Sequence, residues 1–442
     1  MRKFSIDTTV HVRLAHEPGQ LARLIAAVAE TGALVGEISI VSMGERETVR
    51  GVVLETRDER HTEEALARIR GLGVEILRVI DEVFEHHRGG KTQTSSRVKI
   101  ENVVDLRYVY TPGVARVSSA IAATPELAWE YTGIARSVGI FTNGSRVLGL
   151  GNIGPLASLP VMEGKAALYA TFAQLSATPI LVDTLDASEF VETVVRVARS
   201  FGAIHLEDIR IPECFAIERE LTARLAKPVM HDDQHGTATV ALAAIVTACR
   251  LTGMDLKAAR VGQIGLGAAG SAIARLVLAF GAREVLVTDV SPAAVAALVA
   301  SGARGVDLAT LLRESDIVIA TTGRPGLIHP DMVRKGQVIF ALSNPDGEIA
   351  PEVALAAGAA FASDGRSVNN ALAYPGIFKG ALQVRSRAIV PEMLVAAALA
   401  ISARAEGSDV VPSPLDLRVH DAVCAAVAAK ATELGLAGTA RL

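Results

Sequence analysis

Apolar and polar positions along the first part of the chain follow the pattern of a small sheet covered by helices. Alternating and β-branched runs predict strands over 8–14, 34–41, 49–54 and 74–80, and helical spacing predicts helices over 21–28 and 63–70. The resulting order, βαββαβ, is the ferredoxin-like pattern. A polar stretch over 86–96 has the composition of a linker, so we place a first domain at 1–87. The pattern fits a plain dimerisation module as well as a regulatory one.

The rest of the chain predicts two further α/β domains. From residue 260 onward, apolar strands over 261–264, 285–289, 317–321 and 338–342 alternate with helical stretches, which is typical of a doubly wound parallel sheet. We therefore expect a mixed α/β domain at 97–240, a Rossmann-type domain at 241–405 and a C-terminal helical segment at 406–442. A length of 442 residues suggests roughly three domains as well.

Composition narrows the class of protein. Half of the residues are hydrophobic and 21% are charged, so the chain can bury a core and is not disordered. Its 44 basic and 48 acidic side chains argue against nucleic acid or a membrane as partner. Three distant cysteines exclude a disulfide framework and indicate a reducing compartment. Without a visible secretory signal or a bilayer-length apolar run, we expect a cytoplasmic protein.

A glycine motif, GLGAAG over 265–270, follows an apolar strand and begins a helix. Gly265 permits the tight turn, Gly267 lets the backbone approach a pyrophosphate, and Gly270, after Ala269, lets the helix pack closely. Asp289 ends the next strand, where a carboxylate accepts ribose hydroxyls and repels a 2′-phosphate. The motif therefore predicts an NAD site, with NADP as the less favoured cofactor. The alternative is a glycine-rich turn that binds no nucleotide.

Two pairs of acidic residues each follow an apolar strand. Glu207 and Asp208 come after the strand 203–206, and Asp232 and Asp233 come after the strand 228–230. Open α/β sheets place their sites at such strand ends, and oxygen ligands without cysteine suit Mg²⁺ or Mn²⁺. Taken alone, the first pair is better interpreted as a solvated helix start. His231 and His235 have a spacing that could suggest zinc, which the hard ligands disfavour.

Two further side chains are candidates for proton transfer. Lys165 lies among apolar and small residues, where desolvation would lower its pKa and let it act as a base. The alternative for this lysine is an ammonium that reaches the surface. Tyr110 lies in the run YTPGVA and is otherwise a core tyrosine with a satisfied hydroxyl.

Together these motifs resemble the malic enzyme family, in its small bacterial type, over about residues 100–400. The matching words are YTPGVA (110–115), RVLGLGNIG (146–154), PVMEGK (160–165), LED (206–208), HDDQHGT (231–237), SNP (343–345) and NN (369–370). The resemblance implies a two-domain core in which 97–240 binds malate and metal and 241–405 binds NAD. It also implies oxidative decarboxylation of malate to pyruvate and CO₂.

The resemblance further implies a role for each matched residue. Lys165 would be the general base, with Asp232 beside it, and Tyr110 would be the acid that protonates the enolate. Glu207, Asp208 and Asp233 would hold the Mg²⁺ or Mn²⁺ that polarises the C2 oxygen. We divide Asp232 from Asp233 because neighbours in an extended segment point to opposite faces. The remaining substrate or nicotinamide contacts would come from Arg146, Asn344 and Asn370.

The run HEPGQLARL over 16–24 resembles an ACT domain, which implies a small-molecule effector, allosteric control and a homo-oligomer, dimer or tetramer. Two other functions stay open. One is malolactic or oxaloacetate decarboxylase activity without net redox change. The other is a non-catalytic effector-binding protein on the same scaffold, against which the intact set of site residues argues.

Overall fold

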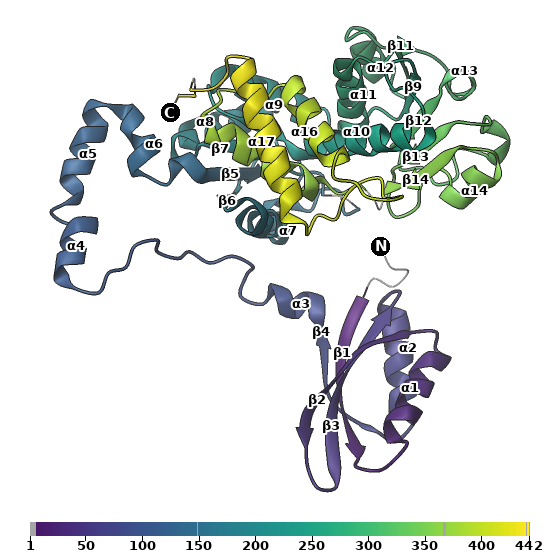
Figure 1. Ribbon diagram of the computed structural model, residues 1–442. Helices are drawn as coiled ribbons and strands as arrows, with labels where there is room; N and C mark the ends of the chain where they lie inside the picture. The colour runs from purple at the N-terminus through teal and green to yellow at the C-terminus, as the bar shows by residue number, and fades with distance from the viewer. Residues whose placement is uncertain (1–5, 148, 366–367, 439, 442) are drawn as a thin grey trace. The chain divides into compact units, whose positions relative to one another are not determined.

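The computed structural model describes residues 6–147, 149–365, 368–438 and 440–441, and the chain divides into two compact units, Met1–Gln93 and Thr94–Leu442 (Figure 1). Each unit has its own apolar core. No helix in these described ranges is both long enough and apolar enough to cross a membrane. Cys214, Cys249 and Cys424 are buried and free, as the absence of a disulfide framework requires.

The first unit is a four-stranded antiparallel sheet with two helices on one face (Figure 1). Its elements are β1 (Ile6–Ala15), α1 (Gln20–Glu30), β2 (Leu34–Met43), β3 (Glu47–Thr56), α2 (Glu59–Arg70), β4 (Glu75–Asp81) and α3 (Glu82–His87). The strand order is β2-β3-β1-β4. Alternate residues of β1, such as Val10 and Val12, are fully buried against Leu24 of α1 and Ile69 of α2. This alternation fixes which face of the sheet the helices cover.

The second unit begins with short helices and a parallel sheet in the order β6-β5-β7-β8. The helices before the sheet are α4 (Val103–Val109), α5 (Val114–Ala123), η1 (Pro125–Leu127), α6 (Ala128–Tyr131) and η2 (Ile134–Arg136). The sheet region comprises β5 (Ser137–Thr142), α7 (Gly154–Leu168), η3 (Tyr169–Ala173), β6 (Ser176–Leu181), α8 (Ala187–Val197), η4 (Ala198–Ser200), β7 (Ala203–Leu206), α9 (Glu213–Arg224) and β8 (Val229–His231). Every residue of β7 and β8 is buried, as parallel strands covered on both faces require.

A second parallel sheet follows, in the order β11-β10-β9-β12-β13-β14. Its elements are β9 (Arg260–Ile264), α11 (Ala268–Phe280), β10 (Glu284–Thr288), α12 (Pro292–Val299), β11 (Arg304–Gly305), α13 (Leu308–Glu314), β12 (Ile317–Ala320), η5 (Pro330–Met332), β13 (Val338–Ala341), α14 (Pro351–Ala356) and β14 (Phe361–Asp364). Counted along the chain, this order is 3-2-1-4-5-6, the order of dinucleotide-binding sheets. The doubly wound sheet predicted from the strand spacing is confirmed.

Helix α10 (Asp232–Thr252) lies between the two sheets along the chain (Figure 1). It is apolar on nearly every side, with Val240, Leu242 and Ile245 fully buried. One continuous core joins β5, α10 and β9. The chain ends with η7 (Asn370–Leu372), α15 (Tyr374–Gln383), α16 (Pro391–Ser402) and α17 (Leu417–Glu433), which pack into the same core.

Candidate active site

Two neighbouring parallel strands, β7 and β8, place four carboxylates at one edge of their sheet. Glu207 and Asp208 follow β7 directly, and Asp232 and Asp233 are the first residues of α10 after β8. Asp208 has a φ of 54°, a left-handed conformation that turns the chain sharply at the end of the strand. Glu207 and Asp208 are only 3% and 4% exposed, so the interpretation of this pair as a solvated helix start is wrong.

Lys165, on α7, reaches this edge and bridges two of the carboxylates. Its Nζ lies 2.5 Å from Oδ2 of Asp232 and 3.0 Å from Oε1 of Glu207. The lysine side chain is 11% exposed, while the two carboxylates are almost completely buried. The structure therefore brings together the candidate base and the carboxylate expected beside it, and it adds Glu207 as a second partner.

The charge of Lys165 follows from these contacts. Burial alone lowers the pKa of the ammonium, but the carboxylates of Asp232 and Glu207 outweigh burial and raise this pKa well above its ordinary value. The lowered pKa expected from the apolar neighbours in the sequence is therefore wrong. The fold supplies two negative charges from distant parts of the chain, and sequence spacing does not reveal them.

Glu207, Asp208 and Asp233 form a cluster suited to a divalent cation. One oxygen from each lies within 4.8 Å of the others. Burial, reinforced by the neighbouring carboxylates, raises the pKa of Asp208 to about 8, and burial raises the pKa of Glu207 to about 7. Oδ2 of Asp208 is buried and has no hydrogen-bond partner among the residues that the structure describes. Crowded carboxylates with an unpartnered oxygen fit Mg²⁺ or Mn²⁺, and three oxygen ligands are the donor set those ions prefer.

Asp232 and Asp233 face different partners, but not for the reason the sequence suggested. The helix α10 begins at Asp232, so the segment is not extended and the alternation argument does not apply. In a helix, consecutive side chains point about 100° apart. Asp232 turns to Lys165, while Oδ2 of Asp233 accepts a hydrogen bond from the backbone N–H of Asp208 at 3.0 Å. The proposed division between the two residues thus agrees with these contacts.

Gly236 makes room for the Asp232 carboxylate. A Cβ at this glycine would stand 1.8 Å from Oδ1 of Asp232 and 3.3 Å from the Cβ of Asn370. The glycine in HDDQHGT is therefore needed because a larger residue would displace the Asp232 side chain, and not because the backbone turns there.

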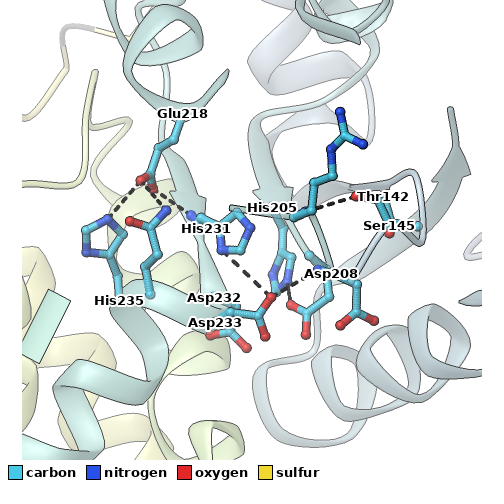
Figure 2. A network of polar contacts seen from close by, with 12 residues as sticks. Thr142, Ser145, His205, Asp208, Glu218, His231, Asp232, Asp233 and His235 are labelled. Carbon is cyan, nitrogen blue, oxygen red and sulfur yellow. Dashed lines mark hydrogen bonds and ion pairs between the residues drawn. The ribbon is translucent and has the colours of Figure 1, made fainter. Parts of the chain in front are cut away.

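Glu218, on α9, holds the other side of the β8–α10 junction (Figure 2). Its Oε1 accepts the backbone N–H of His231 at 2.7 Å, and its Oε2 lies 3.0 Å from Nε2 of both Gln234 and His235. Burial acts to raise the pKa of Glu218, but His235 and the donated hydrogen bonds lower it overall. Within the described ranges, His231 and His235 belong to no cluster that could hold an ion, so the zinc alternative has no support.

The glycine loop has the geometry expected of a nucleotide site. Gly265 has a φ of 85°, and a Cβ at Gly270 would lie 2.0 Å from the carbonyl oxygen of Gly265. Gly267 caps α11, and Ala269 lies in the first turn of that helix. The Asp289 carboxylate accepts hydrogen bonds from the backbone N–H groups of Leu266, at 2.6 Å, and Ser291, at 2.7 Å. Asp289 therefore fixes the loop next to β9.

The other residues predicted for the site differ in their exposure and in whether they contact the carboxylate cluster. Arg146 is exposed, but its charge reaches Asp208 and opposes the rise in the pKa that burial causes. Asn370 packs near Gly236, while Asn344 is exposed and precedes a cis proline, Pro345. Tyr110 is 65% exposed at the end of α4, and no described hydrogen bond or ion pair joins it to Lys165. The structure therefore does not bring Tyr110 to the cluster.

Sequence reasoning missed four aromatic or polar residues around the cluster. Tyr169, His205 and Tyr374 are fully buried beside Lys165 and Glu207, and Glu218 supports the helix start. One signal was available, because His205 interrupts an otherwise apolar strand, Ala203–Leu206. A polar side chain inside a buried strand has to find a hydrogen-bond partner.

A parallel dinucleotide-type sheet joined to a buried lysine–carboxylate cluster defines a two-sheet α/β enzyme. Two family models match the chain. The model for "Malic enzyme, N-terminal domain" matches residues 89–189, and that for "D-isomer specific 2-hydroxyacid dehydrogenase, NAD binding domain" matches residues 230–324. The first range includes Lys165, and the second includes the loop from Gly265 to Gly270.

The chain belongs to the malic enzyme family. It is 50% identical to "NAD-dependent malic enzyme 1" of Bacillus subtilis over 95% of this chain and 96% of that protein. It is 36% identical to "NAD-dependent malic enzyme" of Geobacillus stearothermophilus over 98% and 96% of the two chains. A crystal structure of malic enzyme from Pyrococcus horikoshii has a TM-score of 0.76 and 36% identity, covering 81% of this chain and 92% of that one. The malic enzyme resemblance and the α/β fold are confirmed.

Proposed function

We propose that the chain oxidatively decarboxylates malate to pyruvate and CO₂ with reduction of NAD. The observation that carries the proposal is the contact of Lys165 with Asp232 and Glu207, directly beside the cluster of Glu207, Asp208 and Asp233. A buried proton-transfer pair next to a cation site is what this reaction needs. Relatives named NAD-dependent malic enzyme along almost the whole chain support the same activity.

In this proposal Lys165 and Asp232 remove the proton of the malate C2 hydroxyl. Nζ and Oδ2 lie 2.5 Å apart, so a proton can pass between them, and burial raises the pKa of Asp232 to about 6, which narrows the gap between the pKa of the carboxyl and that of the lysine. Glu207, Asp208 and Asp233 would hold Mg²⁺ or Mn²⁺, which supplies Lewis-acid polarisation of the substrate oxygen. A cation bound to Glu207 would offset the negative charge of that carboxylate. Glu207 would then stabilise the Lys165 ammonium less, and the pKa of Lys165 would fall toward the range in which a lysine can act as a base.

NAD is the proposed cofactor: Gly265, Gly267, Ala269 and Gly270 would hold it, and it would supply the acceptor for the hydride of malate C2. Asp289 follows β10 and accepts the backbone N–H of Leu266 in the glycine loop. We expect its carboxylate to accept a ribose hydroxyl and to disfavour a 2′-phosphate. Both curated relatives reported above carry NAD in their names, although other relatives are named as NADP-dependent. Arg146, Asn344 and Asn370 are proposed to contact the substrate, and Asn344 also the nicotinamide.

Tyr110 is proposed as the acid that protonates the enolate, delivered by a second copy of the chain. Residues 97–123, which hold α4 and α5, contain no buried side chain, and they expose Val103, Tyr108 and Tyr110 by 74%, 73% and 65%. An apolar segment of this kind needs a protein surface to cover it. A homo-oligomer would cover the segment and bring Tyr110 to the site.

The first unit is proposed to be an ACT-like regulatory domain that binds a small effector. Its βαββαβ order and the turn at Gly19, with a φ of 85°, support this assignment. The proposed division of the remainder keeps 97–240 for malate and metal, 241–405 for NAD and 406–442 as a helical segment. If deletion of 1–87 changes neither the oligomeric state nor any effector response, the regulatory proposal fails.

The test is the absorbance of NADH during incubation with malate and Mn²⁺, run with NAD, then with NADP, and then with EDTA. We expect NADH and pyruvate in equal amounts, faster turnover with NAD, and loss of turnover in EDTA. Formation of lactate without NADH would support the malolactic alternative, which one relative's name, "Bifunctional malic/malolactic enzyme", also suggests. Turnover that EDTA does not affect would contradict the metal site.

A further inference from the structure

Each carboxylate oxygen of Glu207 is contacted by a different side chain, and both of these side chains are linked to helix α7. Lys165 lies 3.0 Å from Oε1, and Nε2 of His205 lies 2.6 Å from Oε2. The other nitrogen of that imidazole, Nδ1, lies 2.8 Å from the hydroxyl oxygen of Tyr169. Tyr169 begins η3, the π-helical continuation of α7, one turn after Lys165. The helix therefore holds Glu207 directly through Lys165 and indirectly through Tyr169 and His205.

The imidazole of His205 is fixed by aromatic rings as well. It is fully buried, stacks on Phe378 with ring centroids 5.6 Å apart, and meets Tyr374 edge-on at 5.4 Å. Tyr169 is also fully buried and packs edge-on against Tyr374 at 4.8 Å. Neither the phenol nor the imidazole can exchange its partner for bulk water. Such a site holds one arrangement and loses it if a partner is removed.

The hydrogen bonds fix the tautomer of His205. An ionised Glu207 can only accept, so Nε2 of His205 carries the hydrogen and donates it. Nδ1 of the neutral ring is then an acceptor and takes the hydrogen of the Tyr169 hydroxyl. In the opposite tautomer, Nε2 would turn a lone pair toward the carboxylate. Tyr169 therefore favours the only neutral form of His205 that can hold Glu207.

We propose that Tyr169 and His205 are positioning residues that orient Glu207 for a divalent cation. Of the proposed function, this inference uses only the assignment of Glu207 as a metal ligand. Hydrogen-bonded partners of metal ligands typically contribute about 10- to 100-fold in metal affinity. Because the Tyr169 hydroxyl acts through His205, its effect should depend on the imidazole.

The test measures Mn²⁺ binding directly, by the electron paramagnetic resonance signal of free Mn²⁺, in the full-length chain. Tyr169→Phe keeps the ring and removes only the hydroxyl, and we expect it to weaken Mn²⁺ binding about tenfold. His205→Gln keeps a donor for Glu207 but has no imidazole tautomer to select. In that background, Tyr169→Phe should change the Kd by less than about twofold, since nothing is left for the hydroxyl to orient. Tyr131→Phe, at a tyrosine that is 55% exposed, is the matched control.

Thermal unfolding of each variant shows that it is folded before its Kd is compared. Unchanged Mn²⁺ affinity in folded Tyr169→Phe would overturn the proposal, as would an equal loss in the native and His205→Gln backgrounds. A native chain that binds no Mn²⁺ would overturn it too. If the variants follow the expected pattern but the native chain forms no NADH from malate, the positioning role stands and the proposed reaction fails.

Discussion

Lys165 and Asp232, which are 67 residues apart in the chain, meet with Nζ and Oδ2 separated by 2.5 Å in a buried site. One comes from the last turn of α7 and the other is the first residue of α10. Strands β5, β7 and β8 are neighbours in one parallel sheet, and this pairing brings the helix after β5 and the helix after β8 to the same edge. The predictions below test what this arrangement does.

Lys165→Met should abolish most turnover. The variant removes the proposed base but keeps an unbranched side chain only one atom shorter, so we expect kcat to fall by about 10²- to 10⁴-fold. Steady-state NADH formation with malate, NAD and Mn²⁺ measures the effect. Lys379, on α15, pairs with the exposed Asp421 of α17. Lys379→Met is the control and should retain activity. A kcat within about tenfold of the native value would mean that Lys165 is not the base.

We expect Asp233→Asn to lose mainly Mn²⁺ affinity and Asp232→Asn to lose mainly kcat. Asp233 belongs to the cation cluster, so its variant should lose Mn²⁺ affinity by more than about tenfold. Asp232 contacts Lys165, so its variant should lose mainly kcat and less Mn²⁺ affinity. Mn²⁺ titration followed by kinetics at saturating Mn²⁺ separates the two. The assignment is wrong if Asp233→Asn binds Mn²⁺ as tightly as the native chain.

Gly236→Ala should impair catalysis without harming the helix. Alanine favours a helix by about 1 kcal/mol over glycine, so α10 itself loses nothing. The new Cβ would, however, stand 1.8 Å from Oδ1 of Asp232 and push the carboxylate away from Lys165. A displacement of about 1 Å can cost a rate factor near 10². Gly133→Ala, where nothing lies within 4 Å, is the matched control. Full activity in Gly236→Ala would contradict this account of Asp232.

Gly267→Ala and Gly270→Ala should separate cofactor binding from folding. Among the described residues, apart from the chain neighbours of Gly267, a Cβ at this position would meet Cδ1 of Ile211 at 3.7 Å and nothing closer, so the fold accepts alanine. A pyrophosphate close to that backbone would clash with the methyl group of alanine. The KM for NAD should therefore rise while Tm is unchanged. Gly270→Ala should lower Tm, because its Cβ would meet the carbonyl of Gly265 at 2.0 Å. Unchanged KM for NAD in Gly267→Ala would contradict the nucleotide site.

Lys227 should give stability a distinct pH dependence. Its ammonium is 3% exposed, donates to the carbonyls of Ala198 and Phe201, and burial lowers its pKa to about 8. An unfolded lysine has a pKa of about 10.4, so between these values the folded chain binds fewer protons than the unfolded chain. The free energy of unfolding should therefore rise with pH relative to Lys227→Met, by a total approaching about 3 kcal/mol.

Denaturant unfolding of both proteins at several pH values from 7 to about 10 measures this difference, and the subtraction cancels the other groups. At and below about pH 7 the difference should be nearly constant, because Lys227 is protonated in both states there. A difference that falls as pH rises would contradict a lowered lysine pKa.

Local patterns in the sequence predicted the strands and the glycine loop well. Alternation marks β1 and β3, and the spacing of glycines marks the turn at Gly265, which has a φ of 85°. Strand ends also located both carboxylate pairs, because parallel strands bring their carboxyl ends to one edge. The prediction for the start of α10 was wrong. The sequence pattern predicts an extended segment at Asp232, but Asp232 is the first residue of a helix.

Contacts between distant segments could not be predicted in the same way. Tyr169, His205 and Glu218 each act through a partner on another element. No local spacing encodes these pairings. The raised pKa of Lys165 has the same origin, because it depends on two carboxylates that the fold supplies. Tyr110 marks a further limit, since the structure leaves it 65% exposed and its proposed role depends on a second copy of the chain.

Helix α10 also restricts how this sequence can change its length over evolution. The helix has 21 residues, which is about 30 Å, and buried side chains surround much of its length. One residue gained or lost inside it would rotate everything beyond by about 100° and shift it by about 1.5 Å. The carboxylates at its start would then no longer match the packing at its end. Insertions should therefore accumulate in the loops of this lineage, while the residue count of α10 is inherited unchanged.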